Sequence, residues 1–158
     1  MSLLTRVRGL FFFAKKIHPA PTGAHTQGTA YEAQHPGNHH RPQRIVFSAV
    51  VGGENRELIF DSGASIANYL TESIATTGTS CGTVEDFHPQ KGKYTVNLFS
   101  LPVEVGGETV DIPFGVQPAD IDRDVQMSGA VGVIGVGLYK NFQVLVDCPN
   151  RRLVLGRY

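Results

Sequence analysis

Apolar and polar positions alternate from residue 45 onward in short runs that predict strands rather than helices. Two pairs of runs share one layout, in which a β-rich run, a Gly-Gly step and a second β-rich run follow one another. These pairs are Arg44–Val51 with Arg56–Phe60, and Leu101–Val105 with Thr109–Val116. Two glycines between such runs favour a two-residue hairpin, because both turn positions need a positive φ. The pattern therefore predicts two similar hairpins.

Further strands and one short helix complete the predicted elements. They are weak strands at 83–87 and 94–99, a final hairpin at 143–147 and 152–155, a short helix at 71–76, and a polar loop at 117–130. Many short strands separated by turn residues are typical of a small barrel or sandwich. We therefore expect a mostly β fold, a small barrel or sandwich with one short helix.

The repeated layout indicates an approximate internal duplication. The first copy covers residues 45–64 and the second covers residues 101–135. The first copy ends in Asp61-Ser62-Gly63, whereas the second ends in Val133-Ile134-Gly135 and has no acid at the matching place.

Residues 1–44 differ from the rest of the chain in charge and composition. They carry six basic residues and one acid, a net charge of +5, whereas residues 45–158 carry eight basic and thirteen acidic residues, a net charge of −5. Residues 18–44 contain four prolines and five of the six histidines. Such a segment buries too little apolar surface to offset the entropy of ordering it. We expect a disordered tail at 1–44 and one folded domain at 45–158.

The first seventeen residues form a distinct part of this tail. Apolar residues recur there at helical spacing among basic residues, which is compatible with an amphipathic helix at 1–17. One interpretation is a targeting segment or a contact with a membrane surface. The other is a segment without a role in the mature protein, such as a prosegment, an upstream remnant or a cloning artefact. Leu10–Ala14 is short for a secretory signal, so we expect an intracellular location.

Composition excludes several classes of protein. The 158 residues have a net charge of zero, and no apolar run approaches the ~18–20 residues of a membrane span. The two cysteines, Cys81 and Cys148, form neither a CxxC pair nor a metal-binding pattern. The histidines of the tail lack acidic or cysteine partners close by. We therefore expect no metal and no cofactor.

The Gly-rich segment at 129–137 raises the alternative of a nucleotide site. It has neither the GxGxxG order nor the GxxxxGK[ST] order, and no alternation of strands and helices surrounds it. Nucleic-acid binding by the folded domain is not expected either, because that domain is net acidic.

The candidate chemistry lies in Asp61-Ser62-Gly63-Ala64, which comes directly after the apolar run Leu58-Ile59-Phe60. An acid at the end of a buried strand is disfavoured unless hydrogen bonds or a function compensate. Gly63 would let water or a substrate approach the backbone, and Ser62 could bond to the main chain. The alternative is an ordinary Asx turn that closes a strand.

Residues 45–158 resemble the retropepsin-like aspartic proteases. The resemblance rests on the strand pair before Asp61, the Asp61-Ser62-Gly63-Ala64 motif, the element Val133-Ile134-Gly135, and the ending Leu138–Asp147 with its final hairpin. The chain departs from the family at two positions. Ser62 stands where threonine is more common, and Gly137 stands where members often carry Asp, Asn or Arg. The resemblance implies a single domain that is a small closed barrel of the retropepsin-like acid protease type.

The resemblance also implies an activity, namely hydrolysis of peptide bonds in a peptide or protein substrate. That chemistry needs two facing carboxylates, and the chain has one Asp-Ser-Gly motif. The expected enzyme is therefore a homodimer in which Asp61 of each copy meets its counterpart, supported by a set of loop residues. The set is Ser62, Gly63, Ala64, Val133, Ile134 and Gly135.

A flap over the substrate is implied as well. Its expected place is the 81–99 hairpin, with the tip and substrate contacts at Pro89, Gln90, Lys91 and Gly92. An ordinary exposed hairpin is the alternative for this segment. For the whole domain, the alternative is a non-catalytic protein-interaction module with the same fold.

Overall fold

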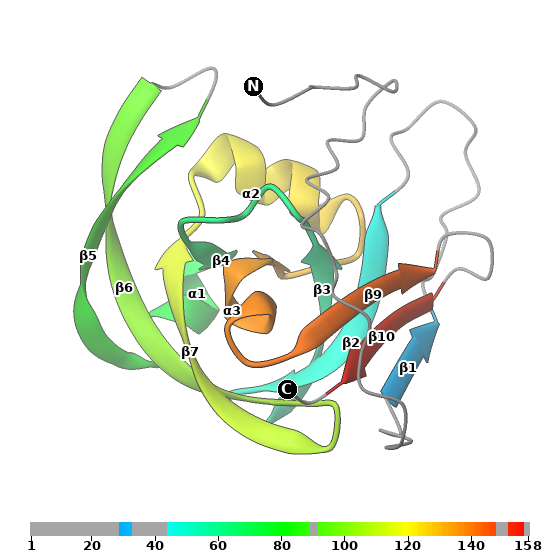
Figure 1. Ribbon diagram of the computed structural model, residues 1–158. Coiled ribbons are helices and arrows are strands. Elements are labelled where there is room, and N and C mark those ends of the chain that lie inside the picture. The colour runs from blue at the N-terminus through cyan, green and yellow to red at the C-terminus, as the bar shows by residue number, and fades with distance from the viewer. Residues whose placement is uncertain (1–28, 33–43, 89–91, 148–151, 157–158) are drawn as a thin grey trace, which may run out of the picture.

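The computed structural model describes residues 29–32, 44–88, 92–147 and 152–156 (Figure 1). Within these ranges there are ten strands and three short helices. In chain order they are β1 (Thr29–Glu32), β2 (Ile45–Val51), β3 (Glu54–Phe60), β4 (Asn68–Leu70), α1 (Glu72–Ala75), β5 (Thr79–His88), β6 (Gly92–Val105), β7 (Glu108–Val116), α2 (Ala119–Gln126), β8 (Gly132–Ile134), α3 (Val136–Tyr139), β9 (Gln143–Asp147) and β10 (Arg152–Gly156).

Six of the strands close into a barrel, as the family resemblance implies. Their order is β2-β3-β8-β4-β7-β6, and β6 pairs back with β2 through Val50↔Glu104 and Val51↔Val103. β5 pairs only with β6, and the two form a long hairpin that curves along one side of the barrel (Figure 1). The predicted mostly β fold is confirmed.

Both Gly-Gly turns are two-residue hairpins with positive φ at each glycine. The angles are 60° and 88° at Gly52 and Gly53, and 66° and 78° at Gly106 and Gly107. Residues other than glycine rarely adopt these backbone angles. The Gly-Gly turns therefore fix the register of β2 with β3 and of β6 with β7. The two predicted hairpins are confirmed.

The internal duplication is visible in the strand pairing. β3 lies parallel to β8, β7 lies parallel to β4, and β4 and β8 pair antiparallel between them. β7 is therefore the counterpart of β3, and β8 is the counterpart of β4. The predicted match between the Asp61 motif and Val133–Gly135 is wrong in register, because the residue that comes after β7 is Gln117.

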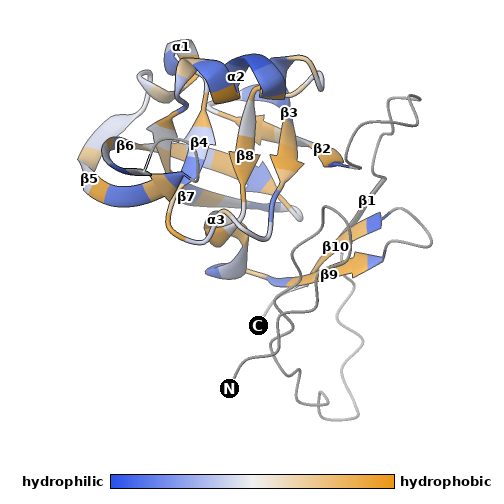
Figure 2. Cartoon of the chain, turned by 90° about the horizontal axis from the view of Figure 1, so that it is seen from above, coloured by the Kyte–Doolittle hydropathy of each residue, from blue (hydrophilic) through white to orange (hydrophobic). Residues whose placement is uncertain are grey.

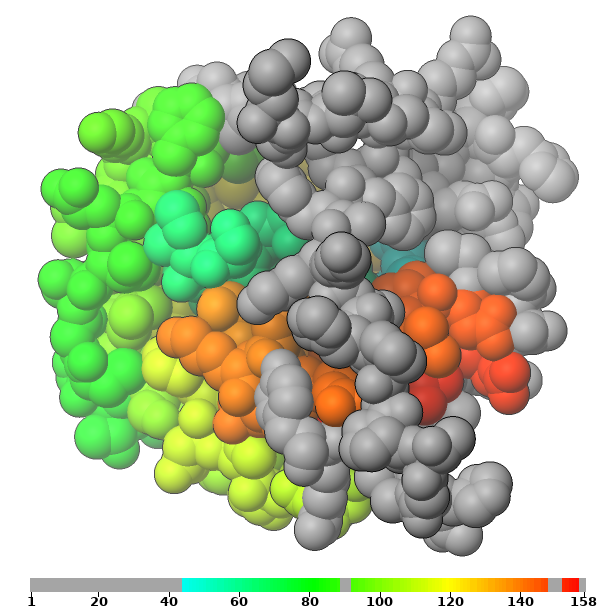
Figure 3. Space-filling model, viewed as in Figure 1, coloured from blue at the N-terminus to red at the C-terminus, as the bar shows by residue number. Residues whose placement is uncertain are grey.

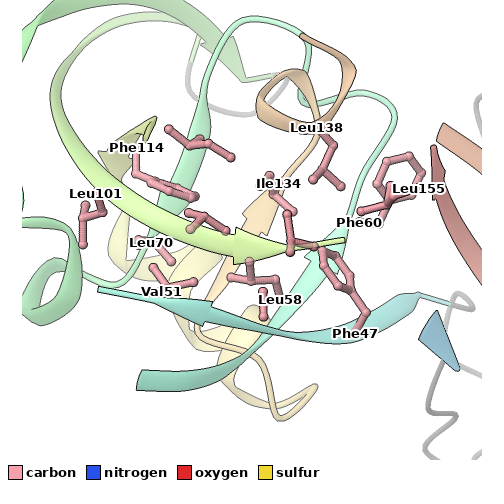
Figure 4. Packing of buried hydrophobic residues seen from close by; sticks show 14 of the residues in the cluster. Phe47, Val51, Leu58, Phe60, Leu70, Leu101, Phe114, Ile134, Leu138 and Leu155 are labelled. Carbon is pink, nitrogen blue, oxygen red and sulfur yellow. The ribbon is translucent and has the colours of Figure 1, made fainter. Parts of the chain in front are cut away.

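The main core fills the barrel with aliphatic and aromatic side chains from nearly every strand (Figure 4). Leu58, Leu70, Phe114, Ile134 and Leu138 are fully buried in it. Residues from both copies thus meet in one cluster. At ~25 cal/mol per Å² of apolar surface, this burial is the main stabilising contribution.

A second, smaller cluster lies beneath α2. The sequence predicts a polar loop at 117–130, and that prediction is wrong over Ala119–Gln126. Ile121 and Val125 are four residues apart, so they share one face of the helix and pack with Val46 and Ile59. Polar residues, mostly aspartates, occupy most of the other positions of the helix, so the sequence pattern is mainly polar and does not reveal this two-residue apolar face.

The helix predicted at 71–76 is confirmed as α1, and α3 is an additional single turn that the sequence pattern does not separate from its neighbours. Among the described residues the longest helix has eight residues, and none is long and apolar enough to cross a bilayer.

The chain ends form a three-stranded sheet beside the barrel, in the order β1-β10-β9 (Figure 2). The pairing of β9 with β10 confirms the final hairpin. Thr29–Glu32, which falls in the predicted disordered tail, forms β1 instead, because its four residues pair with Arg152–Leu155 of β10. The proposed amphipathic helix at 1–17 lies outside the described residues.

Candidate active site

Asp61 stands where β3 leaves the core. Leu58, Ile59 and Phe60 are all at most 8% exposed, and Asp61 is exposed. The Asp61 N–H donates to the Ile134 carbonyl over 3.0 Å, which extends the parallel pairing of β3 and β8 by one bond. The carboxyl group is thus presented to solvent from a rigid strand end.

The residues after Asp61 form a tight turn around its carboxylate. The Gly63 N–H donates to Asp61 Oδ1 over 2.7 Å, and the Ala64 N–H donates to the Asp61 carbonyl over 3.1 Å. A Cβ at Gly63 would lie 3.1 Å from the same Oδ1 atom, so glycine permits this close approach. The Asx turn named as the alternative is therefore present, and it fixes the direction of the carboxyl group.

Gly135 supports this turn from below. A Cβ at position 135 would lie 2.3 Å from the Asp61 carbonyl oxygen and 2.6 Å from that of Ala64. The Val136 N–H also donates to the Ala64 carbonyl over 2.7 Å. Only glycine allows the two loops to pack this closely, so residues 61–64 and 134–136 form one unit.

Asn68 holds the second of these loops, and the sequence reasoning missed it. Its side chain is 2% exposed, and Oδ1 accepts the N–H groups of Gly135 and Gly137 over 3.0 and 2.9 Å. Nδ2 donates to the Pro113 carbonyl over 3.0 Å. A Cβ at Gly137 would lie 2.9 Å from Nδ2, so a glycine at position 137 leaves room for the Asn68 side chain. The signal was a polar residue within an apolar strand.

Tyr139 of α3 reaches the turn from the other side. Its ring packs edge-on against Phe60, with centroids 5.8 Å apart, and its hydroxyl shares a hydrogen bond with Ser62. Burial, and secondly the negative charge of Asp61, raise the pKa of the Tyr139 phenol, whereas the bond to Ser62 lowers it. The net shift is upward, so Tyr139 stays a neutral hydrogen-bonding group beside Asp61.

The other predicted support residues are placed differently. Ile134 is fully buried and contributes its carbonyl, whereas Val133 packs against the small cluster beneath α2. Of the predicted flap residues, Pro89, Gln90 and Lys91 lie outside the described residues. Gly92 opens β6 with φ of 75° and pairs with His88.

The turn lies between two neighbouring parts of the surface. Figure 3 shows the segment after β3, in teal, between the green β5–β6 hairpin and the orange region of α3. In the described ranges, no group of three His, Cys, Asp or Glu side chains is arranged to hold a metal ion.

A solved protease structure shares this architecture, and a second one is reported beside it. The retropepsin-like aspartic protease from Rickettsia conorii matches with a TM-score of 0.55 and 19% identity, over 84% of this chain and 92% of that one. The Simian Foamy Virus (mac) protease matches with a TM-score of 0.41 and 18% identity, over 57% of this chain and 86% of that one. No family model matches the sequence. No curated protein matches it either.

The chain therefore has the retropepsin-like fold, which confirms the predicted fold class. One fold can carry different sites, so an activity has to be argued from the Asp61 turn and its surroundings.

Proposed function

We propose that the protein is an aspartic endopeptidase that works as a homodimer, with Asp61 of each copy forming the catalytic pair. The observation that carries the proposal is the Asp61 turn itself. An exposed carboxyl group stands at the end of a buried strand and is fixed by the Gly63 N–H and by the packing on Gly135. The retropepsin-like fold supports the same role.

The chemistry explains why two copies are needed. One carboxylate takes a proton from water as the water attacks the amide carbonyl, and a protonated carboxyl group donates a hydrogen bond to the carbonyl oxygen. Two carboxylates about 3 Å apart cannot both be ionised, so they share one proton and titrate as a pair. One Asp61 cannot fill both roles, and a two-fold axis supplies the second.

In this dimer Ser62 braces the two loops, and Tyr139 keeps its hydroxyl in place from within the same chain. The β5–β6 hairpin is the flap that covers an extended peptide, with Pro89, Gln90, Lys91 and Gly92 at its tip. Closing such a lid excludes water other than the nucleophile.

The first test is the substitution Asp61→Asn, which keeps the shape of the side chain but removes the acid. We expect cleavage of a peptide library at acidic pH by the parent protein, inhibition by a statine-type peptide, and loss of all turnover in the variant. Asp111→Asn is the matched control, because Asp111 is an exposed acid on β7. Unchanged cleavage by Asp61→Asn would remove Asp61 from the mechanism.

A second test addresses the pairing of the two copies. Parent protein and the Asp61→Asn variant are mixed in equal amounts and allowed to exchange subunits. If both carboxylates are required, about one quarter of the dimers are active, whereas independent subunits would keep about one half of the activity. Sedimentation at micromolar concentration checks that dimers are present.

A further inference from the structure

A hydrogen-bonded cluster joins the β5–β6 hairpin to β4, next to the Asp61 loop. The Tyr69 hydroxyl, from β4, donates to the Asp86 carboxylate of β5. The same hydroxyl lies 3.1 Å from the Tyr94 hydroxyl of β6. Asp86 and Tyr94 are directly opposite each other in the hairpin, so one phenol of β4 binds both of its strands.

The alternation of exposure along the hairpin places this cluster on its inner face. Asp86 and Tyr94 are partly buried. In the next inner pair Val84 is partly buried and Val96 is buried, whereas the neighbouring Glu85 is exposed. Successive side chains of a strand point to opposite faces, so Glu85 lies on the outer face. The cluster is thus part of the contact between the hairpin and the barrel.

The packing beneath the cluster is equally close. A Cβ at Gly115 of β7 would lie 2.3 Å from Val96 Cγ1 and 3.1 Å from Tyr69 Cε1. Because Gly115 has no side chain, Val96 of the hairpin and the Tyr69 ring can pack directly against β7. Burial, and next the bond to Asp86, raise the pKa of the Tyr69 phenol, so the hydroxyl keeps its proton for this bond.

β4 has a second role that makes this contact relevant to the site. Tyr69 comes after Asn68, whose side chain holds the loop at Gly135 and Gly137. Neighbouring residues of a strand point to opposite faces. β4 therefore contacts the loop at Gly135 and Gly137 through one face and the β5–β6 hairpin through the other.

We propose that Tyr69 is a positioning residue that holds the β5–β6 hairpin in register with the Asp61 loop, through Asp86 and Tyr94. The effect on catalysis rests on the proposed function, whereas the effect on the hairpin does not. Tyr69 itself touches neither substrate nor the reacting atoms in this role. Its loss loosens the hairpin and weakens substrate binding more than it slows the chemical step.

The test measures hydrogen exchange of the amides at 82–88 and 92–97 in Tyr69→Phe and in Asp86→Asn. Tyr69→Phe removes the hydrogen bond, and Asp86→Asn replaces its charged acceptor by a neutral amide oxygen, while both keep most of the side-chain volume. We expect roughly tenfold faster exchange in the hairpin in Tyr69→Phe, a smaller increase in Asp86→Asn, and unchanged exchange in β2 and β3. Glu85→Gln is the matched control, since it removes an acid from the outer face of the same strand. Combining Tyr69→Phe with Asp86→Asn should add little to the change in Tyr69→Phe alone.

Kinetics then test the link to the site. We expect KM for a peptide substrate to rise roughly fivefold to tenfold in Tyr69→Phe, with kcat within about twofold of the parent value. Unchanged exchange in both variants would overturn the proposal, whether or not the parent protein cleaves peptides. Faster exchange in a protein without peptidase activity would support the positioning role and overturn the proposed function instead. A fall in kcat at constant KM would overturn the assigned role in substrate binding.

Discussion

The two ends of the barrel have the same strand pairing, but the segments that follow the strands differ. At one end β3 and β8 run parallel, and the Asp61 N–H donates to the Ile134 carbonyl over 3.0 Å. At the other end β7 and β4 run parallel, and the Gln117 N–H donates to the Leu70 carbonyl over 2.9 Å. Asp61 and Gln117 are therefore structural counterparts.

The segment after each strand decides the character of each end. Asp61 leads into a tight turn that leaves it exposed, whereas Gln117 leads into Pro118 and α2 and is only 5% exposed. The Gln117 Nε2 group donates to Asp122 of α2 over 3.1 Å and to the Val131 carbonyl over 3.4 Å, and its Oε1 is buried with no hydrogen-bond partner among the residues that the structure describes. The same backbone frame thus presents an acid at one end and is sealed by a helix at the other.

The largest expected effect is at Gly135, whose counterpart at the sealed end is Thr71. In Gly135→Ala the new Cβ meets two backbone oxygens, so we expect a loss of about 3 kcal/mol of unfolding free energy and no detectable turnover. Thr71→Ala removes a 3.2 Å bond to Asp122 and should cost about 1 kcal/mol. Urea denaturation measures both. Equal losses in the two variants would contradict the difference between the ends.

A smaller loss is expected at Asn68. Asn68→Ala leaves the N–H groups of Gly135 and Gly137 and the Pro113 carbonyl without their partner. Water can occupy part of the vacated space, so we expect a cost of about 2 kcal/mol together with reduced activity. Asn97→Ala, an exposed asparagine on β6, should stay within about 0.5 kcal/mol. Comparing the denaturation midpoints of the two variants shows whether the loss of stability depends on the burial and contacts of the asparagine or on the residue type alone.

At the sealed end polarity should be dispensable. Gln117→Leu removes the unpartnered Oε1 and fills the same space, while Asp122 keeps its bonds from Thr71 and Gln126. We expect a change of less than about 1 kcal/mol, because removal of the buried Oε1 offsets the loss of the two bonds from Nε2 to Asp122 and Val131. Peptidase activity should be retained. A loss above about 2 kcal/mol, or of activity, would show that Gln117 has a role of its own.

The smallest effect is expected from pH. The pKa values of Tyr69 and Tyr139 are raised above their usual value of 10.0 in the folded protein, mainly by burial. The unfolded chain therefore releases these protons first, and the stability is fully present below about pH 10 and falls as the pH rises above it. Denaturation from about pH 8 to 11 should show this decline, and Tyr69→Phe and Tyr139→Phe should each reduce it. A flat profile in the parent protein would contradict the raised values.

The sequence predicted the elements that local chemistry determines. The Gly-Gly hairpins follow from the need for positive φ, and the mostly β fold follows from the strand spacing. Asp61 was found because it ends an apolar run and begins a known motif. These features are encoded within a few neighbouring residues.

Features that depend on distant partners could not be predicted in this way. Asn68 is defined by loop residues 67 and 69 positions further along, and α2 by two apolar residues that meet β2 and β3. The tail strand Thr29–Glu32 is ordered by the far end of the chain. In each case the deciding contact joins segments that a single sequence does not relate.

The pairing of β1 with β10 has a consequence for trimming of the chain. A cut before residue 29 leaves Thr29–Glu32 in place as a cover for the outer row of backbone groups on β10. A cut after residue 32 leaves the backbone N–H and C=O groups on that side of β10 unpaired, and such an exposed strand edge can pair with a strand of another polypeptide. The position of the cut therefore determines whether the four-residue strand β1 or the longer strand β10 forms this edge of the sheet.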